Sequence, residues 1–227
     1  MTRPLLHYLA ALFTLTIYGG QVCPYLESLP LLDLAAILVG ALGLQYLTHF
    51  LFWVPLVDLA PLEHQSRRVL GFVLATFVTG GIALSLFNLA VFDFPLGSGF
   101  KLIVGFLALG VFCATDMSLA QSRKIHSRFT QIKPTLEPKQ LFVSHRRGLF
   151  IFVFSQCTLM IGVFFLLIAK DLDWMIEQSA YLSSLEAKRS ILLELFFVGG
   201  IALVHLTNLA LAYSKNLSQF FNLENQA

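Results

Sequence analysis

The chain alternates between long apolar stretches and short polar ones. Its 227 residues contain six apolar stretches, each close to the roughly twenty residues that a helix needs to cross a hydrocarbon core of about 30 Å. We expect spans at about 5–22, 31–53, 69–91, 102–121, 148–170 and 190–213. The pattern therefore predicts an all-α, polytopic membrane protein with six transmembrane helices.

The predicted spans pair into three tandem helical hairpins, at about 1–66, 67–146 and 147–213, and a helical extension follows at 214–227. The first span of each hairpin carries an Arg, a Leu, a Thr and an Ile at identical spacing. The three copies are Arg3, Leu5, Thr14 and Ile17, then Arg68, Leu70, Thr79 and Ile82, then Arg147, Leu149, Thr158 and Ile161. Two interpretations stay open: hairpins packed around a threefold axis along the membrane normal, or a duplication without symmetric packing.

The composition agrees with this class, because a chain that is 57% hydrophobic and 12% charged has too few polar residues to coat a soluble globule. Most of its 15 Lys and Arg residues fall at the amino end, in the second and fourth predicted loops and in the tail. Cytoplasmic loops are enriched in Lys and Arg. Both termini are therefore expected in the cytoplasm.

The fourth predicted loop, 121–148, is the longest and mixes basic with apolar residues. We expect an irregular segment that lies along the membrane surface and contacts anionic lipid head groups. No sequence typical of a folded nucleic-acid reader surrounds these basic residues, so nucleic acid is not an expected partner.

Small residues occur in two similar strings, Gly80-Gly81-Ile82-Ala83-Leu84 and Gly199-Gly200-Ile201-Ala202-Leu203. Glycines let helix backbones approach closely in lipid. Tight helix packing is expected at both strings.

Polar side chains inside spans are costly in lipid and are therefore candidates for function. When the second spans of the hairpins are superposed, two sets of equivalent polar positions appear, one helical turn apart and on the same helical face. We expect them to form a polar coupling cluster: Tyr46, His49, Cys113, Asp116, His205 and Asn208.

Three interpretations of this cluster remain open. The first is an interhelical hydrogen-bond network that pairs Asp116 with a histidine, and the second is a set of groups that merely face head groups or water. The third is a metal site on His49, Asp116 and His205, with or without Cys113, or a haem held by paired histidines. No dense ligand motif accompanies these residues, so no metal and no cofactor are expected. No catalytic residue is expected either, because the phosphate-loop, His-Glu-x-x-His and Gly-x-Ser-x-Gly motifs are all missing from the sequence.

The sixth predicted span continues past the expected membrane edge with apolar residues at three- and four-residue spacing. This signal-relay helix carries Leu206, Leu209, Tyr213, Asn216, Phe220 and Leu223. The spacing fits a coiled-coil seam in a homodimer, with Asn216 setting the register. It fits equally an amphipathic helix that lies against its own protein.

Two strings carry a resemblance to a known family. Residues 206–217, Leu-Thr-Asn-Leu-Ala-Leu-Ala-Tyr-Ser-Lys-Asn-Leu, with Phe220-Phe221 and Glu224-Asn225, resemble the junction where six-span domains of bacterial class III adenylate/guanylate cyclases pass into a HAMP relay. The run Lys170-Asp171-Leu172-Asp173-Trp174 is similar to that family as well. The resemblance implies a sensory or anchoring domain in the bacterial inner membrane, coupled through HAMP to a cyclase. Residues 1–227 contain no HAMP or cyclase sequence, so the implied effector lies outside them.

The leading hypothesis is thus a six-span sensory and anchoring domain that dimerises and relays a signal through its sixth helix. The first alternative is a small transporter or channel whose polar residues line a path. The second is a structural subunit of a larger membrane complex, with apolar outer surfaces that bind another protein.

Overall fold

The structure of the protein, a computed structural model, describes residues 2–22, 29–93, 96–132, 154–169, 171–172 and 184–224. In these residues the chain forms helices and no strand, so the all-α prediction is confirmed. The elements are α1 (Thr2–Val22), α3 (Leu31–Trp53), the π-helical turn η1 (Val54–Asp58), α4 (Leu62–Phe92), α5 (Leu96–Ile132), the Phe154–Ala169 helix and α7 (Ser184–Glu224).

Four described helices are long and apolar enough to cross a membrane. They are Leu31–Asp58, His64–Phe92, Gly99–Ile125 and Ile191–Lys215. The apolar Phe154–Ala169 helix is shorter, and α1 is not among the four. The structure therefore supports a membrane protein, whereas the predicted number of six spans is not confirmed.

One predicted span has the bounds of its helix, whereas one predicted hairpin boundary does not fall between helices. The second span was expected at 31–53, and α3 has those bounds. The hairpin boundary predicted between 66 and 67 falls inside α4, which already begins at Leu62, directly after Pro61.

The prediction of an irregular loop at 121–148 is wrong for its first part, because α5 continues without a break to Ile132. This segment is rich in Gln, Arg and Lys, which favour helix, and it contains no proline before Pro134. Residues 133–148 lie outside the described part of the chain. The expected contact with anionic lipid stays a prediction.

A proline and an aspartate shape the two ends of the α3–α4 region. Pro55 has no N–H to donate, and its ring would clash with the carbonyl of Leu51 in a regular α-helix. The helix accordingly widens into η1, where the Leu59 N–H reaches back to the Val54 carbonyl over 3.1 Å. At the other end α4 stops at Asp93, which adopts the left-handed conformation with φ 54° and donates its N–H to the Asn88 carbonyl.

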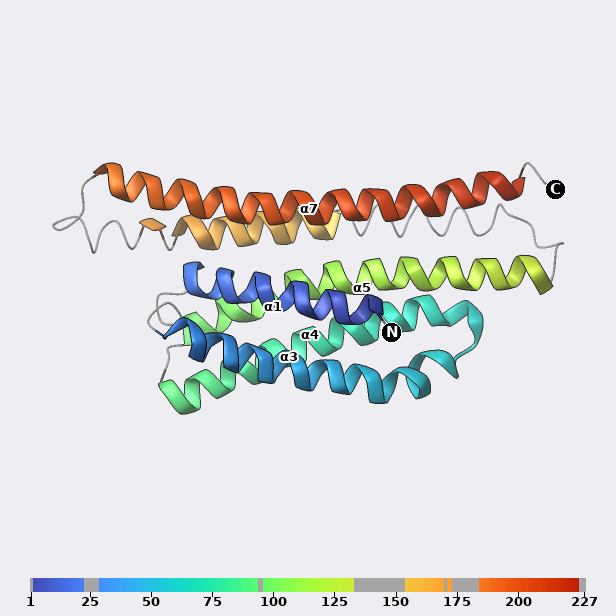
Figure 1. Cartoon of the computed structure of the whole chain (residues 1–227), viewed down its shortest axis with the longest axis horizontal. Helices are drawn as coiled ribbons and strands as arrows, with labels where there is room; N and C mark the ends of the chain where they lie inside the picture. The colour runs from blue at the N-terminus through green and yellow to red at the C-terminus, as the bar shows by residue number, and fades with distance from the viewer. Residues whose placement is uncertain are drawn as a thin grey trace.

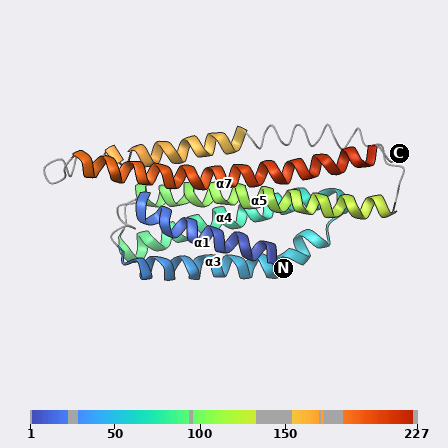
Figure 2. The same cartoon turned by 45° about the horizontal axis from the view of Figure 1, so that its top comes forward.

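The helices lie side by side in an elongated bundle (Figure 1). In both views α7 and the Phe154–Ala169 helix lie together along one edge, α3 lies at the opposite edge, and α5 lies between them (Figure 2). The start of α1 and the ends of α5 and α7 point toward the same end of the bundle. We call this the amino end of the bundle.

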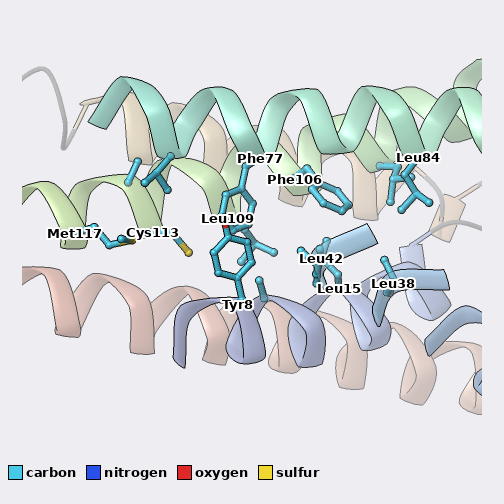
Figure 3. Close-up of a cluster of buried hydrophobic side chains, with 14 of the residues drawn as sticks. Tyr8, Leu15, Leu38, Leu42, Phe77, Leu84, Phe106, Leu109, Cys113 and Met117 are labelled. Carbon is cyan, nitrogen blue, oxygen red and sulfur yellow. The ribbon is translucent and has the colours of Figure 1, made fainter. Parts of the chain in front are cut away.

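The central position of α5 agrees with its burial. In the apolar window of α5, 67% of the residues are buried, against 22–33% in the other three candidate spans. The main core joins α1, α3, α4 and α5, and Tyr8 of α1 points toward Phe77 of α4 within it (Figure 3). A smaller core of Ala108, Val163, Leu167 and Val198 attaches the Phe154–Ala169 helix and α7 to α5.

The α4–α5 pair interlocks through glycines. A Cβ atom on Gly110 of α5 would lie 2.6 Å from the Cβ of Phe77, and one on Gly81 of α4 would lie 2.8 Å from the Cβ of Phe106. Each phenylalanine thus occupies the space that the glycine of the other helix leaves open. A Cβ on Gly80 would collide with the Gln45 carboxamide of α3.

The second glycine string has no comparable contact. No described atom lies within 4 Å of a Cβ built on Gly200, and on Gly199 the nearest is the Phe164 Cζ at 3.9 Å. The expectation of tight packing is thus confirmed for Gly80 and Gly81, and it is not met at Gly199 and Gly200 within the described residues.

The interlock predicts opposite effects for two glycine substitutions. Gly110→Ala forces Phe77 to move and should destabilise the protein by about 1–3 kcal/mol, as overpacking of a core does. In Gly43→Ala the new methyl group meets no described atom within 4 Å, and helix propensity should hold stability constant or raise it by up to about 1 kcal/mol. Thermal unfolding of both variants in detergent measures the difference, and equal stabilities would contradict the interlock.

Candidate functional site

A buried carboxylate ties α5 to the start of α1. Asp116 of α5 is 2% exposed. Arg3 donates to both carboxylate oxygens, from Nε to Oδ2 over 3.0 Å and from Nη2 to Oδ1 over 2.9 Å. His7 Nε2 lies 2.7 Å from the same Oδ2. Since Arg3 and His7 are four residues apart, they lie on one face of α1 and both bind the carboxylate.

The two sides of this contact differ in exposure. The Asp116 side chain is 3% exposed and the Arg3 side chain 47%, so the ion pair lies at the edge of the bundle and is partly screened. The carboxylate itself lies inside, where an unpaired charge is costly. Loss of the contact would therefore leave a buried, unpaired charge on Asp116, whereas the charge of Arg3 is already partly exposed.

The next turn of α5 bonds to α4. The Ser118 hydroxyl donates to the Ser66 carbonyl over 2.9 Å, and the Ser66 hydroxyl donates to the Ser118 carbonyl over 3.0 Å. Gln121 Nε2 donates to Gln65 Oε1 over 2.9 Å. Gln65 in turn donates to the carbonyls of Asp58 and Ala60, which fixes the connection between α3 and α4.

Another residue of α5, Arg123, bonds to α7. Arg123 Nη1 donates to the Ala212 carbonyl over 3.1 Å. Within two helical turns, α5 thus bonds to α1, α4 and α7. We name Asp116, Ser118, Gln121 and Arg123 the α5 hub.

Part of the predicted polar cluster gathers around Tyr8 rather than around Asp116. The Tyr8 ring lies 5.5 Å from the Tyr46 ring and 5.9 Å from His49, both edge-on, and it stacks on Phe77 at 5.4 Å. His49 also packs against Trp53 at 4.9 Å and Phe72 at 5.5 Å. His49 is therefore enclosed by aromatic rings from three helices.

The remaining cluster residues have contacts of their own. Cys113 is buried in the main core, close to Met117 and Leu109 (Figure 3). His205 stacks on Phe112 with the ring centres 4.4 Å apart, and Asn208 is exposed. The structure thus brings Tyr46 and His49 together, and it leaves Asn208 outside.

The pair of Asp116 with a histidine exists, although its partner is His7 and not a member of the predicted cluster. Among the side chains that the structure describes, no three His, Cys, Asp or Glu residues gather as metal ligands would. The metal hypothesis on His49, Asp116 and His205 receives no support, because each of the three lies in a different contact.

The predicted polar coupling cluster did not contain Arg3, His7 and Tyr8. A signal for them existed: a carboxylate in a span requires a cationic partner, and Arg3 and His7 lie one helical turn apart near the end of the chain expected on the same membrane side. The superposition of hairpins could not show it, because the contact joins a first span to a second span of another hairpin.

A chain whose described residues are helical and contain four candidate spans defines a polytopic membrane protein. Comparison with known proteins makes the class specific. The model of the MASE10 family matches residues 7–197, so the chain belongs to MASE10, a family of membrane-associated sensory domains. No curated protein and no solved structure matches the chain.

Removal of the Asp116 charge should loosen α1. In Asp116→Asn, Arg3 and His7 lose a carboxylate that accepts three hydrogen bonds. We expect a loss of about 1–3 kcal/mol in unfolding free energy, since hydrogen bonds to charged groups are in this range and Arg3 is half exposed.

A double-mutant cycle of Arg3→Gln with Asp116→Asn should give a coupling energy of about 0.5–3 kcal/mol. Arg67→Gln is the matched control, because Arg67 is exposed and bonds to no side chain in the described ranges. Additive effects of Arg3→Gln and Asp116→Asn would show that the contact is absent in the bilayer.

Proposed function

We propose that the protein is a membrane sensory and anchoring domain that relays a signal through α7 to a cytoplasmic effector such as a nucleotide cyclase. We place it in a bacterial inner membrane with both termini in the cytoplasm. The observation that carries the proposal is the length of α7, a single helix of 41 residues. At 1.5 Å per residue it measures about 60 Å, twice the roughly 30 Å of a hydrocarbon core.

The far part of α7 is suited to transmit motion. Its candidate span ends at Lys215, and the helix continues unbroken to Glu224. A continuous helix transmits rotation or translation without loss at a joint. Membership of a sensory family supports this role.

The structure limits where α7 can meet a second copy. Leu209 and Ala212 are buried against their own chain, at 7% and 5% exposure, so this part of the expected seam is already occupied. Leu206 is 39% exposed. The side chains of Asn216, Phe220 and Leu223 lie outside the described part of α7. We therefore assign the homodimer contact to the segment after Tyr213.

Between the described residues, α7 has fewer contacts with α5 and α1 than α4 has with α5. They include the small core around Ala108 and Val198, the stack of His205 on Phe112, and the bond from Arg123 to the Ala212 carbonyl. The α4–α5 pair, in contrast, is interlocked by glycines and by the Ser66–Ser118 bonds. A stimulus shifts a two-state element most easily where the contacts are weakest. We infer that α7 moves against a rigid α4–α5 pair.

The alternative of a transporter or channel has less support. Its predicted path would run through Gln45, His49, Asp116, Gln156 and His205. In the structure Gln45 packs on Gly80, His49 on aromatic rings, Asp116 on α1 and His205 on Phe112. Flux through reconstituted vesicles tests this alternative directly, and flux that Asp116→Asn abolishes would favour it over signalling.

Insertions into α7 test the relay. One alanine inserted between Lys215 and Asn216 rotates everything beyond it by about 100°, whereas seven inserted residues restore the phase to within about 20°. In the natural full-length product, we expect the single insertion to uncouple cyclic nucleotide production from the stimulus and the seven-residue insertion to restore it. Equal output from both variants at matched membrane levels would contradict a rotational relay.

The size of the natural product tests whether an effector follows. An antibody against residues 133–148 should detect, in native membranes, a band well above the 25.3 kDa of these residues. A band at that mass would contradict a covalently attached effector and would direct the work to co-purified partners.

A further inference from the structure

A hollow separates the two cores of the bundle. It lies between α1, α5, the Phe154–Ala169 helix and α7, and Leu15, Ala108, Phe112, Met160, Phe197 and Ala202 are among its lining residues. The main core contains Leu15, and the smaller core contains Ala108. The hollow is therefore the place where the α7 edge of the bundle fails to close onto the rest.

Small residues explain why the space stays open. Gly105 and Ala108 of α5 face Ala202 of α7 across the hollow, and none of the three has a side chain long enough to fill it. A void of this kind deprives its walls of packing contacts, so an occupant that restores those contacts is stabilised there.

Water is not that occupant. The cavity measures about 50 Å³, several times the roughly 10–15 Å³ that one water molecule needs. The surface that it exposes is wholly apolar, and apolar cavities stay dry and take up apolar molecules instead. Thr14 and His205 are also among the lining residues, but the surface that the hollow exposes is apolar and favours a hydrocarbon.

The position of the hollow identifies the hydrocarbon. Its α5 and α7 walls belong to the candidate spans Gly99–Ile125 and Ile191–Lys215. The hollow is partly open to the outside, and on α7 the neighbouring outward side chains Phe196 and Val204 are apolar and exposed, at 81% and 68%. At this depth a membrane protein is surrounded by lipid chains.

We propose that the hollow between α5 and α7 holds the terminal methylene groups of one acyl chain of a bilayer phospholipid, which enters from the side. The chain completes the packing between the α4–α5 pair and α7. Its occupancy sets how closely α7 approaches α5. On the proposed function, on which this last step rests, the length and order of the bilayer acyl chains are a stimulus that α7 reports.

A free fatty acid is the competing occupant. Gln156 lies one helical turn from Met160, is 0% exposed and bonds to no described residue. Its carboxamide would suit the carboxyl end of a free acid. A phospholipid does not need Gln156, because its head group stays at the membrane surface.

Photo-crosslinking tests the site without any signalling readout. The full chain is reconstituted with a phospholipid that carries a diazirine near the end of one acyl chain. We expect labels on the peptides that contain Ala108 and Ala202. Ala202→Phe, which fills the hollow, should reduce this labelling roughly tenfold, the effect of losing about two buried methylene groups.

A further variant acts in the opposite direction and needs no bulky residue, and it has its own control. Phe197→Ala widens the hollow and should raise labelling of the α5 peptide, whereas Phe196→Ala, on the exposed face of the same helix, should leave it unchanged. Val204→Phe is the matched control for Ala202→Phe. Size-exclusion profiles confirm that each variant folds.

Labelling that all four variants leave unchanged would overturn the proposal, because it would report only the lipid around the protein. Labelling by a diazirine fatty acid, lost in Gln156→Leu, without labelling by the phospholipid would overturn the assignment to a bilayer lipid. If the site is labelled as expected and acyl-chain length does not alter effector output, the lipid site is supported and the proposal that α7 reports acyl-chain length is contradicted. The two failures are thus distinguishable.

Discussion

The pairing of Asp116 with Arg3 and His7 is the constraint on which the arrangement of the bundle depends. A carboxylate in an apolar helix cannot stay unpaired, and its partners lie in the first two turns of α1. This contact sets both the depth and the rotation of α1 against α5. Once they are set, Tyr8 meets Phe77 and Leu15 enters the main core (Figure 3). A single polar contact thereby gives the register for the apolar packing that follows along α1.

The contacts of α5 with α4 differ in kind from its contacts with α7. Toward α4 it offers reciprocal serine bonds and a buried glutamine pair, backed by the exchange of Phe77 and Phe106 into glycine spaces. Toward α7 it offers one bond from Arg123 to the Ala212 carbonyl, a ring stack and a small core. In lipid, where packing and hydrogen bonds replace the hydrophobic effect between helices, this difference among the described residues is the basis on which we propose that α7 moves against α4–α5.

The sequence predicted the all-α class and the bounds of α3, but not the partners of the polar residues, for a physical reason. Apolar length depends on bilayer thickness alone, so α3 has its expected bounds. The partner of a polar group depends on tertiary packing. His49, Asp116 and Asn208 are equivalent by repeat, yet one lies among aromatic rings, one in an ion pair and one is exposed. The continuation of α5 to Ile132 was missed because charged residues end an apolar stretch without ending a helix.

The two similar glycine strings differ in how they pack. Gly81 receives Phe106, and so α4 cannot slide along α5 without a clash. In the matching string of α7, a Cβ built on Gly200 meets no described atom within 4 Å, so the same residues there provide no lock. The hollow lies along the same stretch of α7, where its lining includes Val198 and Ala202. Two similar strings thus occur in a helix that is locked against its neighbour, α4, and in one that is not locked by described residues, α7.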